Sequence, residues 1–117
     1  MLNACRAFLI LPIEVLTTDT TKTHSIKALL DCGAIGSFIN KDFVWARKIN
    51  TWSLSYSIFV FNVDGSPNKV GQISKIVNIV LHYNFHLEWM LLAVSSLGKQ
   101  NLILDYSWLK DHSLEVD

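Results

Sequence analysis

The residue of this chain best suited to chemistry is Asp31, an acidic side chain that follows an apolar run and precedes a glycine. Residues 28–30 read Ala-Leu-Leu, and residues 32–34 read Cys-Gly-Ala. A carboxyl group at the mouth of an apolar core has its pKa raised by desolvation, whereas nearby backbone amides lower it. Such a position can hold a general acid or base, although Asp-x-Gly at the end of a strand is also a common turn.

A second candidate is the pair His82 and His86, which lie four residues apart beside Glu88. On a helix this spacing could place two metal ligands on one face. The surrounding residues, Val80–Leu87, instead favour a hairpin, and no cysteine or further histidine lies nearby. We therefore expect two surface or cross-strand histidines, with no metal and no other cofactor.

Two other features invite functional interpretations that the sequence does not support. The stretch Gly33–Gly36 precedes a possible helix but lacks the Gly-Lys-Ser/Thr of a phosphate loop and the dinucleotide fingerprint. Cys32 could be a nucleophile, yet no histidine is close to it in sequence. We expect neither a nucleotide site nor a thiol-based reaction.

The chain contains four tryptophans, at positions 45, 52, 89 and 108. Aromatic side chains can stack on the bases of nucleic acid, but no basic stripe accompanies these. The sequence therefore predicts that the tryptophans pack in the core or at interfaces, and that this domain does not bind nucleic acid.

Length and composition indicate one small domain, spanning residues 1–117. Half of the 117 residues are hydrophobic, and ten basic residues balance ten acidic ones. A net charge of zero gives no general attraction to nucleic acid or anionic lipid, and it favours self-association. Two cysteines do not make a disulfide framework, so we expect a reducing, cytoplasmic location. The apolar run Phe8–Val15, interrupted by Pro12 and Glu14, predicts neither a signal peptide nor a membrane anchor.

The elements that must position Asp31 are short strands separated by turns. Alternating or apolar runs predict strands at Arg6–Thr17, His24–Asp31, Ser53–Val63, Val70–Tyr83, Leu87–Val94 and Leu102–Leu104. Turns are expected at Thr18–Thr23, at 64–68 and near Asn84. Short helices are expected within Ser37–Lys48, capped by Asn40, and at Ser107–His112. The pattern predicts an all-β, small, closed, barrel-like fold with one or two short helices.

Three segments resemble one protein family, in its order and at plausible spacing. Residues 28–39, ALLDCGAIGSFI, are similar to the active-site segment of retropepsins, in which two apolar residues precede Asp-Ser/Thr-Gly-Ala. Residues 62–68 resemble the flap hairpin of the retrotransposon members. Residues 102–117 are similar to their closing motif, Ile-Leu-Gly-x-x-Trp-Leu-x-x-His followed by Asn-Pro-x-Ile-Asp. The chain thus resembles the retropepsin-like aspartic protease domain of gypsy-class long-terminal-repeat retrotransposon polyproteins.

This resemblance implies a homodimeric aspartic endopeptidase of acid protease fold, with each chain supplying half of the active site. The two Asp31 carboxylates would share one proton, so that one activates a water and the other polarises the scissile carbonyl. The substrate would be polypeptide, such as the polyprotein of the element itself. The implied catalytic loop contains Cys32, Gly33 and Ala34, and the implied flap region contains Asp64, Gly65, Ser66 and Pro67.

Three residues depart from the family pattern. Cys32 replaces a serine or threonine whose hydroxyl braces the dimer, and Ile35 replaces a threonine. Asp105 replaces the glycine of Ile-Leu-Gly, where a side chain and a charge would crowd the catalytic loop. These differences predict weak or absent activity, and the alternative function is a catalytically silent relic or a dimerisation or peptide-binding module.

Overall fold

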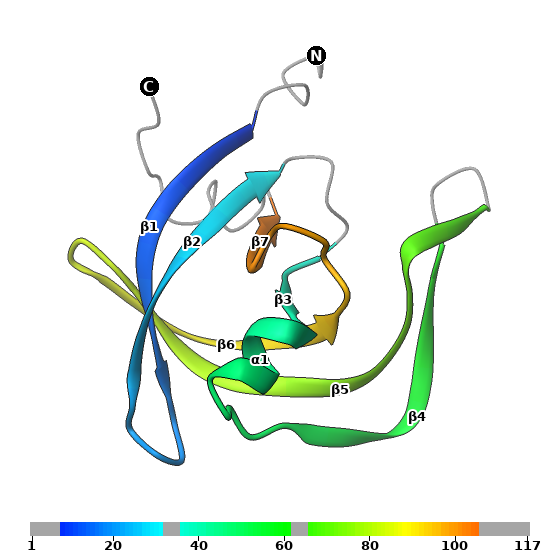
Figure 1. Ribbon diagram of the computed structural model, residues 1–117, viewed down its shortest axis with the longest axis horizontal. Helices are drawn as coiled ribbons and strands as arrows, with labels where there is room; N and C mark the ends of the chain where they lie inside the picture. The colour runs from blue at the N-terminus through cyan, green and yellow to red at the C-terminus, as the bar shows by residue number, and fades with distance from the viewer. Residues whose placement is uncertain (1–7, 32–35, 62–65, 106–117) are drawn as a thin grey trace.

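A computed structural model describes residues 8–31, 36–61 and 66–105, which form seven strands and one short helix (Figure 1). In chain order these are β1 (Phe8–Thr17), β2 (Thr23–Asp31), β3 (Phe38–Asn40), α1 (Lys41–Ala46), β4 (Trp52–Phe61), β5 (Pro67–Tyr83), β6 (His86–Ser95) and β7 (Leu102–Asp105). The helix expected at Ser107–His112 lies outside the described residues. Within the described ranges, no helix is long and apolar enough to cross a membrane.

Six of the strands close into a barrel. The order is β1-β2-β7-β3-β6-β5, and an additional pairing of β1 with β5 joins the two ends of this series. The fourth strand, β4, pairs with β5 alone and extends the sheet outside the closed ring as a two-stranded arm (Figure 1). This arrangement confirms the expected all-β, closed, barrel-like fold.

The interior of the barrel follows the alternation that the sequence predicted. Leu11, Ile13 and Val15 of β1 are buried, and the residues between them are exposed. Every second residue of a strand faces the same side of the sheet, so this pattern directs one face of each strand inward. The core is completed by Ile26, Ala28, Leu30, Ile39, Val77, Ile79, Leu81, Leu92, Leu102 and Leu104.

The short helix expected within Ser37–Lys48 is α1, and the residues before its cap form a strand that was not predicted. Phe38–Asn40 forms strand β3, in which Phe38 pairs with Ile103 of β7 and with Ala93 of β6. Tertiary pairing overrides the local preference here, because Phe38 and Ile39 gain both ladder bonds and burial as strand residues. The predicted cap is confirmed, since the Asn40 side chain accepts a hydrogen bond from the Asp42 amide.

Asn40 also fastens the loop that leads into β7. Its side-chain amide donates to the Gly98 and Gln100 carbonyls, at 3.1 and 2.9 Å, and its backbone amide donates to the Asn101 carbonyl at 2.8 Å. Asn40 is buried, so an alanine there would lose the cap and leave two carbonyls without these donors. We expect Asn40→Ala to lower the free energy of unfolding by about 2–4 kcal/mol, measured by urea denaturation. Asn101→Ala, an exposed asparagine just before β7, is the matched control and should change it by less than about 1 kcal/mol.

Three of the tryptophans, which were expected in the core or at interfaces, lie on the surface of this chain. Trp45, Trp52 and Trp89 are 86%, 43% and 69% exposed. On α1, the buried positions are taken by Phe43 and Val44, and on β6 Trp89 occupies an outward position of the alternating strand. Trp108 lies outside the described residues.

A buried histidine makes the stability of the barrel depend on pH. His24 of β2 packs edge-on against the Phe43 ring, with centroids 6.2 Å apart, and the Arg47 guanidinium lies 4.9 Å from the same ring. Burial of His24, and then the positive charges of Arg47 and Lys22, lower the pKa of this imidazole. The folded protein therefore resists a proton that the unfolded chain accepts near its ordinary pKa of about 6.5.

The contribution of neutral His24 to the free energy of unfolding should consequently be fully present above about pH 6.5 and should decrease as the pH falls below that value. We expect the urea midpoint of the native chain to drop between about pH 7.5 and pH 5, and His24→Gln to remove part of this drop. His82→Gln, which changes an exposed histidine, is the control. An unchanged pH dependence in the His24 variant would contradict this assignment.

Candidate active site

Asp31 is the last residue of β2, a strand held on both sides. The Asp31 backbone pairs with Phe8 of β1 in antiparallel register and with Asp105 of β7 in parallel register. The residues just before it are apolar and enclosed, because Leu30 is 4% exposed and Ala28 is completely buried. Because β2 pairs with a strand on each side and is packed against the core through Ala28 and Leu30, the backbone position of Asp31 is fixed.

The neighbouring strand β7 brings a second acidic residue to the same place. Because β2 and β7 run parallel, both strands end at one edge of the sheet, and Asp31 and Asp105 are paired Cα positions. Adjacent strands lie about 4.8 Å apart, so the two backbones are in direct contact there. This is the neighbourhood that the family pattern implies for position 105.

Strand β7 lies between β2 and β3 in the sheet. The start of β3 is anchored, since the Ser37 carbonyl accepts a hydrogen bond from the Ala93 amide at 3.3 Å and Phe38 is buried. The expected catalytic-loop residues Cys32, Gly33 and Ala34, and the divergent Ile35, lie outside the described residues.

The expected flap region falls at the tip of the arm formed by β4 and β5. Ser66 is exposed, Pro67 begins β5, and Phe61 pairs with Pro67 across the arm. Asp64 and Gly65 lie outside the described residues. In Figure 1 the arm curves away from the barrel, and its tip and the Asp31 end of β2 both lie in the upper part of the view.

Sequence reasoning missed the exposed apolar residues of this arm. Tyr56, Ile58 and Phe59 of β4 are 73%, 47% and 62% exposed. The register between β4 and β5 shifts twice, and β5 is the one described strand that pairs with β4. The partial alternation of residues 53–61 was the available signal, because strict alternation indicates one buried face and its breakdown indicates a strand exposed on both faces.

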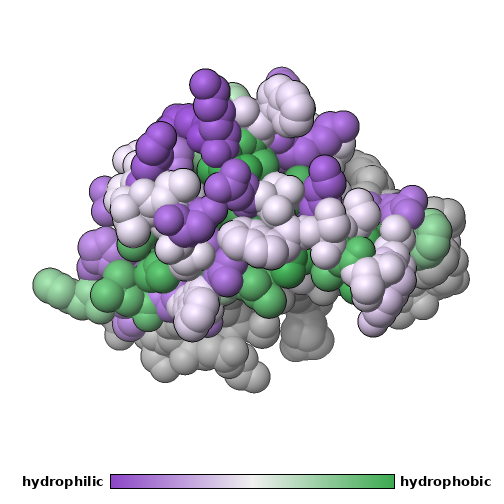
Figure 2. Space-filling view, turned by 90° about the horizontal axis from the view of Figure 1, so that it is seen from below, coloured by the Kyte–Doolittle hydropathy of each residue, from purple (hydrophilic) through white to green (hydrophobic). Residues whose placement is uncertain are grey.

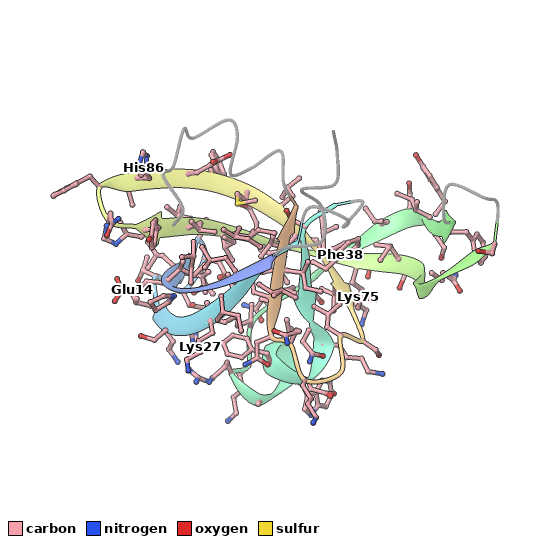
Figure 3. The ribbon with its side chains drawn as sticks, turned by 90° about the horizontal axis from the view of Figure 1, so that it is seen from above. Glu14, Lys27, Phe38, Lys75 and His86 are labelled. Carbon is pink, nitrogen blue, oxygen red and sulfur yellow. The ribbon has the colours of Figure 1, made fainter. Side chains whose placement is uncertain are left out.

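The two histidines lie elsewhere, at the turn joining β5 to β6. This turn is the expected hairpin: Tyr83 pairs with His86, and Asn84 adopts a left-handed φ of 55°. His82 lies 3.4 Å from the Glu14 carboxylate of β1, and Figure 3 shows Glu14 and His86 as separate surface positions. Among the residues that the structure describes, no group of three His, Cys, Asp or Glu side chains could hold a metal.

Comparison with known proteins identifies the class of this fold. The structure of EIAV protease complexed with the inhibitor HBY-793 is similar to this chain, with a TM-score of 0.58 over 93% of each chain and 16% sequence identity. The barrel is therefore that of a retroviral protease.

The family follows from the sequence match. A family model described as the PEG10/RTL1 protease domain matches residues 27–117, which include the ends of both β2 and β7. The chain belongs to this family of gypsy-derived, retropepsin-like aspartic protease domains.

Proposed function

We propose that this chain is one subunit of a homodimeric aspartic endopeptidase, with Asp31 as its catalytic residue. The observation that carries the proposal is the place of Asp31, at the end of a strand in which Ala28 and Leu30 are buried, in a chain of a protease-domain family. The domain would span residues 1–117 and supply half of the enzyme.

The dimer follows from the number of carboxylates that the reaction needs. Aspartic proteases use two carboxylates that share one proton, because two carboxylates so close together cannot both remain ionised. The sequence contains one Asp-x-Gly-Ala segment, at Asp31–Ala34. A second copy related by a two-fold axis supplies the other Asp31.

Each group then has a defined task. One Asp31 takes a proton from the attacking water, while the protonated Asp31 of the second copy donates a hydrogen bond to the scissile carbonyl. Gly33 and Ala34 shape the loop around them, and Cys32 takes the bracing position with a thiol, a weaker donor than a hydroxyl. The arm tip at Asp64–Pro67 closes over an extended polypeptide and excludes water. A polyprotein of the parent element is the substrate that the family resemblance favours.

A separate observation favours a second candidate function. The register pairs Asp105 with Asp31, at a position where the family pattern has glycine. Like charges at paired positions of a sheet are destabilising, and an added side chain can crowd a packed site. The alternative is therefore a retropepsin-like domain that keeps the fold and the dimer without cleaving peptides.

The deciding experiment is cleavage of a mixed peptide library at about pH 5 by the purified protein. Its oligomeric state is measured in the same buffer by sedimentation. Cleavage by a dimer supports the protease, and a folded dimer without cleavage supports the silent domain. A monomer that cleaves peptides contradicts the shared Asp31 pair.

A further inference from the structure

A hollow on the surface lies between α1 and the strands β5 and β6. It has a volume of about 890 Å³, and its lining includes Lys41, Trp45, Lys48 and Lys75. In Figure 1 the helix lies at the lower side of the barrel, whereas the Asp31 end of β2 lies above it. The hollow is thus separate from the candidate active site.

The charged side chains known to line the hollow are of one sign. Among the described residues, three lysines line it and no aspartate or glutamate does. Lys41 and Trp45 are four residues apart and share one side of α1, Lys48 follows the helix, and Lys75 comes from β5 opposite. Within the described ranges none of the three forms an ion pair. The nearest carboxylate that the structure links to the lining is that of Asp19, which accepts a hydrogen bond from Asn50.

The aromatic ring at the hollow indicates which kind of anion would bind there. Trp45 is 86% exposed, although its helix neighbours Phe43 and Val44 are buried. An exposed indole beside three lysines offers a flat surface for stacking together with charge for phosphate, which is the combination that single-stranded nucleic acid uses. Uncharged hydrogen-bonding groups of Gln72 and Ser74 also line the hollow.

We propose that this hollow, formed by Lys41, Trp45, Lys48 and Lys75, binds single-stranded nucleic acid. The lysines contact phosphates and a base stacks on Trp45. An acidic peptide would use the lysines but has no general need of the indole, and a duplex does not expose the faces of its bases.

This inference reverses the expectation drawn from the sequence, which found no basic stripe near the tryptophans. The reason is topological: Lys75 is distant from the helix along the chain and is brought to it by the folding of β5. Figure 2 shows the face seen from below, where hydrophilic side chains gather. Other exposed lysines lie elsewhere, as Lys27 does relative to Lys75 in Figure 3.

The test is fluorescence anisotropy of labelled oligonucleotides of about 12 nucleotides, one of RNA and one of DNA, titrated with the full chain over a series of salt concentrations. Three phosphate contacts predict a slope of log K against log salt of about −2. The triple variant Lys41→Gln, Lys48→Gln, Lys75→Gln should abolish this slope, and Trp45→Ala should weaken binding roughly tenfold. Equal binding of both oligonucleotides indicates recognition of phosphate and base alone, whereas a preference for RNA indicates that the 2′-hydroxyl is also read.

Two matched controls keep the test specific. The triple variant Lys22→Gln, Lys27→Gln, Lys99→Gln removes the same charge from exposed lysines outside the hollow, and Trp89→Ala removes an exposed tryptophan on β6. Both should bind as the native chain does. An equal loss in the controls, or no binding by the native chain, overturns the proposal. Displacement by polyglutamate with no effect of Trp45→Ala would assign the hollow to acidic peptides instead.

Discussion

Replacing Asp31 by asparagine is expected to lower kcat/KM for peptide cleavage by at least about a thousandfold. Asparagine keeps the shape of the side chain but can neither take a proton from water nor share one with a second carboxylate. Because each copy of the proposed dimer carries the change, both halves of the pair are lost together. The measurement is the initial rate of cleavage of a peptide selected from the library, for native and variant proteins at equal dimer concentration.

The variant must be shown to be intact for this result to have meaning. Its urea midpoint and its sedimentation coefficient should match those of the native chain, since the change is isosteric. Asp42→Asn, which alters an exposed carboxylate at the start of α1, is the control and should leave cleavage within about twofold of the native rate. If the Asp31 variant cleaves as fast as this control, Asp31 is not the catalytic residue.

Much of the fold could be predicted from the sequence, because local patterns determine most of the strands. The apolar runs in Arg6–Thr17 and at the end of His24–Asp31 placed β1 and β2 nearly at their observed limits, and Asn84 marked the turn between β5 and β6. Strand β3 at Phe38–Asn40 was not predicted, because it depends on distant pairing and not on a local pattern. A strand of three residues is stabilised by partners from β6 and β7, which lie far away in the chain.

The site shows the same division between local and distant information. The segment around Asp31 could be recognised from its own residues and from the family it resembles. Its pairing with Asp105 depends on a parallel register between β2 and β7, which no local pattern encodes. The basic hollow was missed for this reason too, since Lys75 of β5 is brought to α1 only by folding, and Trp45 was expected to pack in the core or at an interface.

The second large effect is expected at Asp105, where a change to glycine should raise the rate of peptide cleavage about tenfold or more. The paired register puts position 105 beside the backbone of Asp31. An added side chain in a packed site costs about 1–3 kcal/mol. The expected gain is the part of this cost that displaces Asp31 from its productive position, since about 1.4 kcal/mol of activation free energy corresponds to a factor of ten in rate. The rate is measured under the conditions used for the Asp31 variant, together with the urea midpoint.

Asp105→Asn separates the two ways in which this aspartate could interfere. It removes the charge and keeps the volume, so activation by both variants indicates electrostatic repulsion, and activation by glycine alone indicates crowding of the loop. Equal rates in all three proteins would show that Asp105 does not restrain catalysis. A fall in rate on either change would contradict the idea that Asp105 restrains catalysis, and the urea midpoint would show whether the loss comes from a less stable fold or from the site itself.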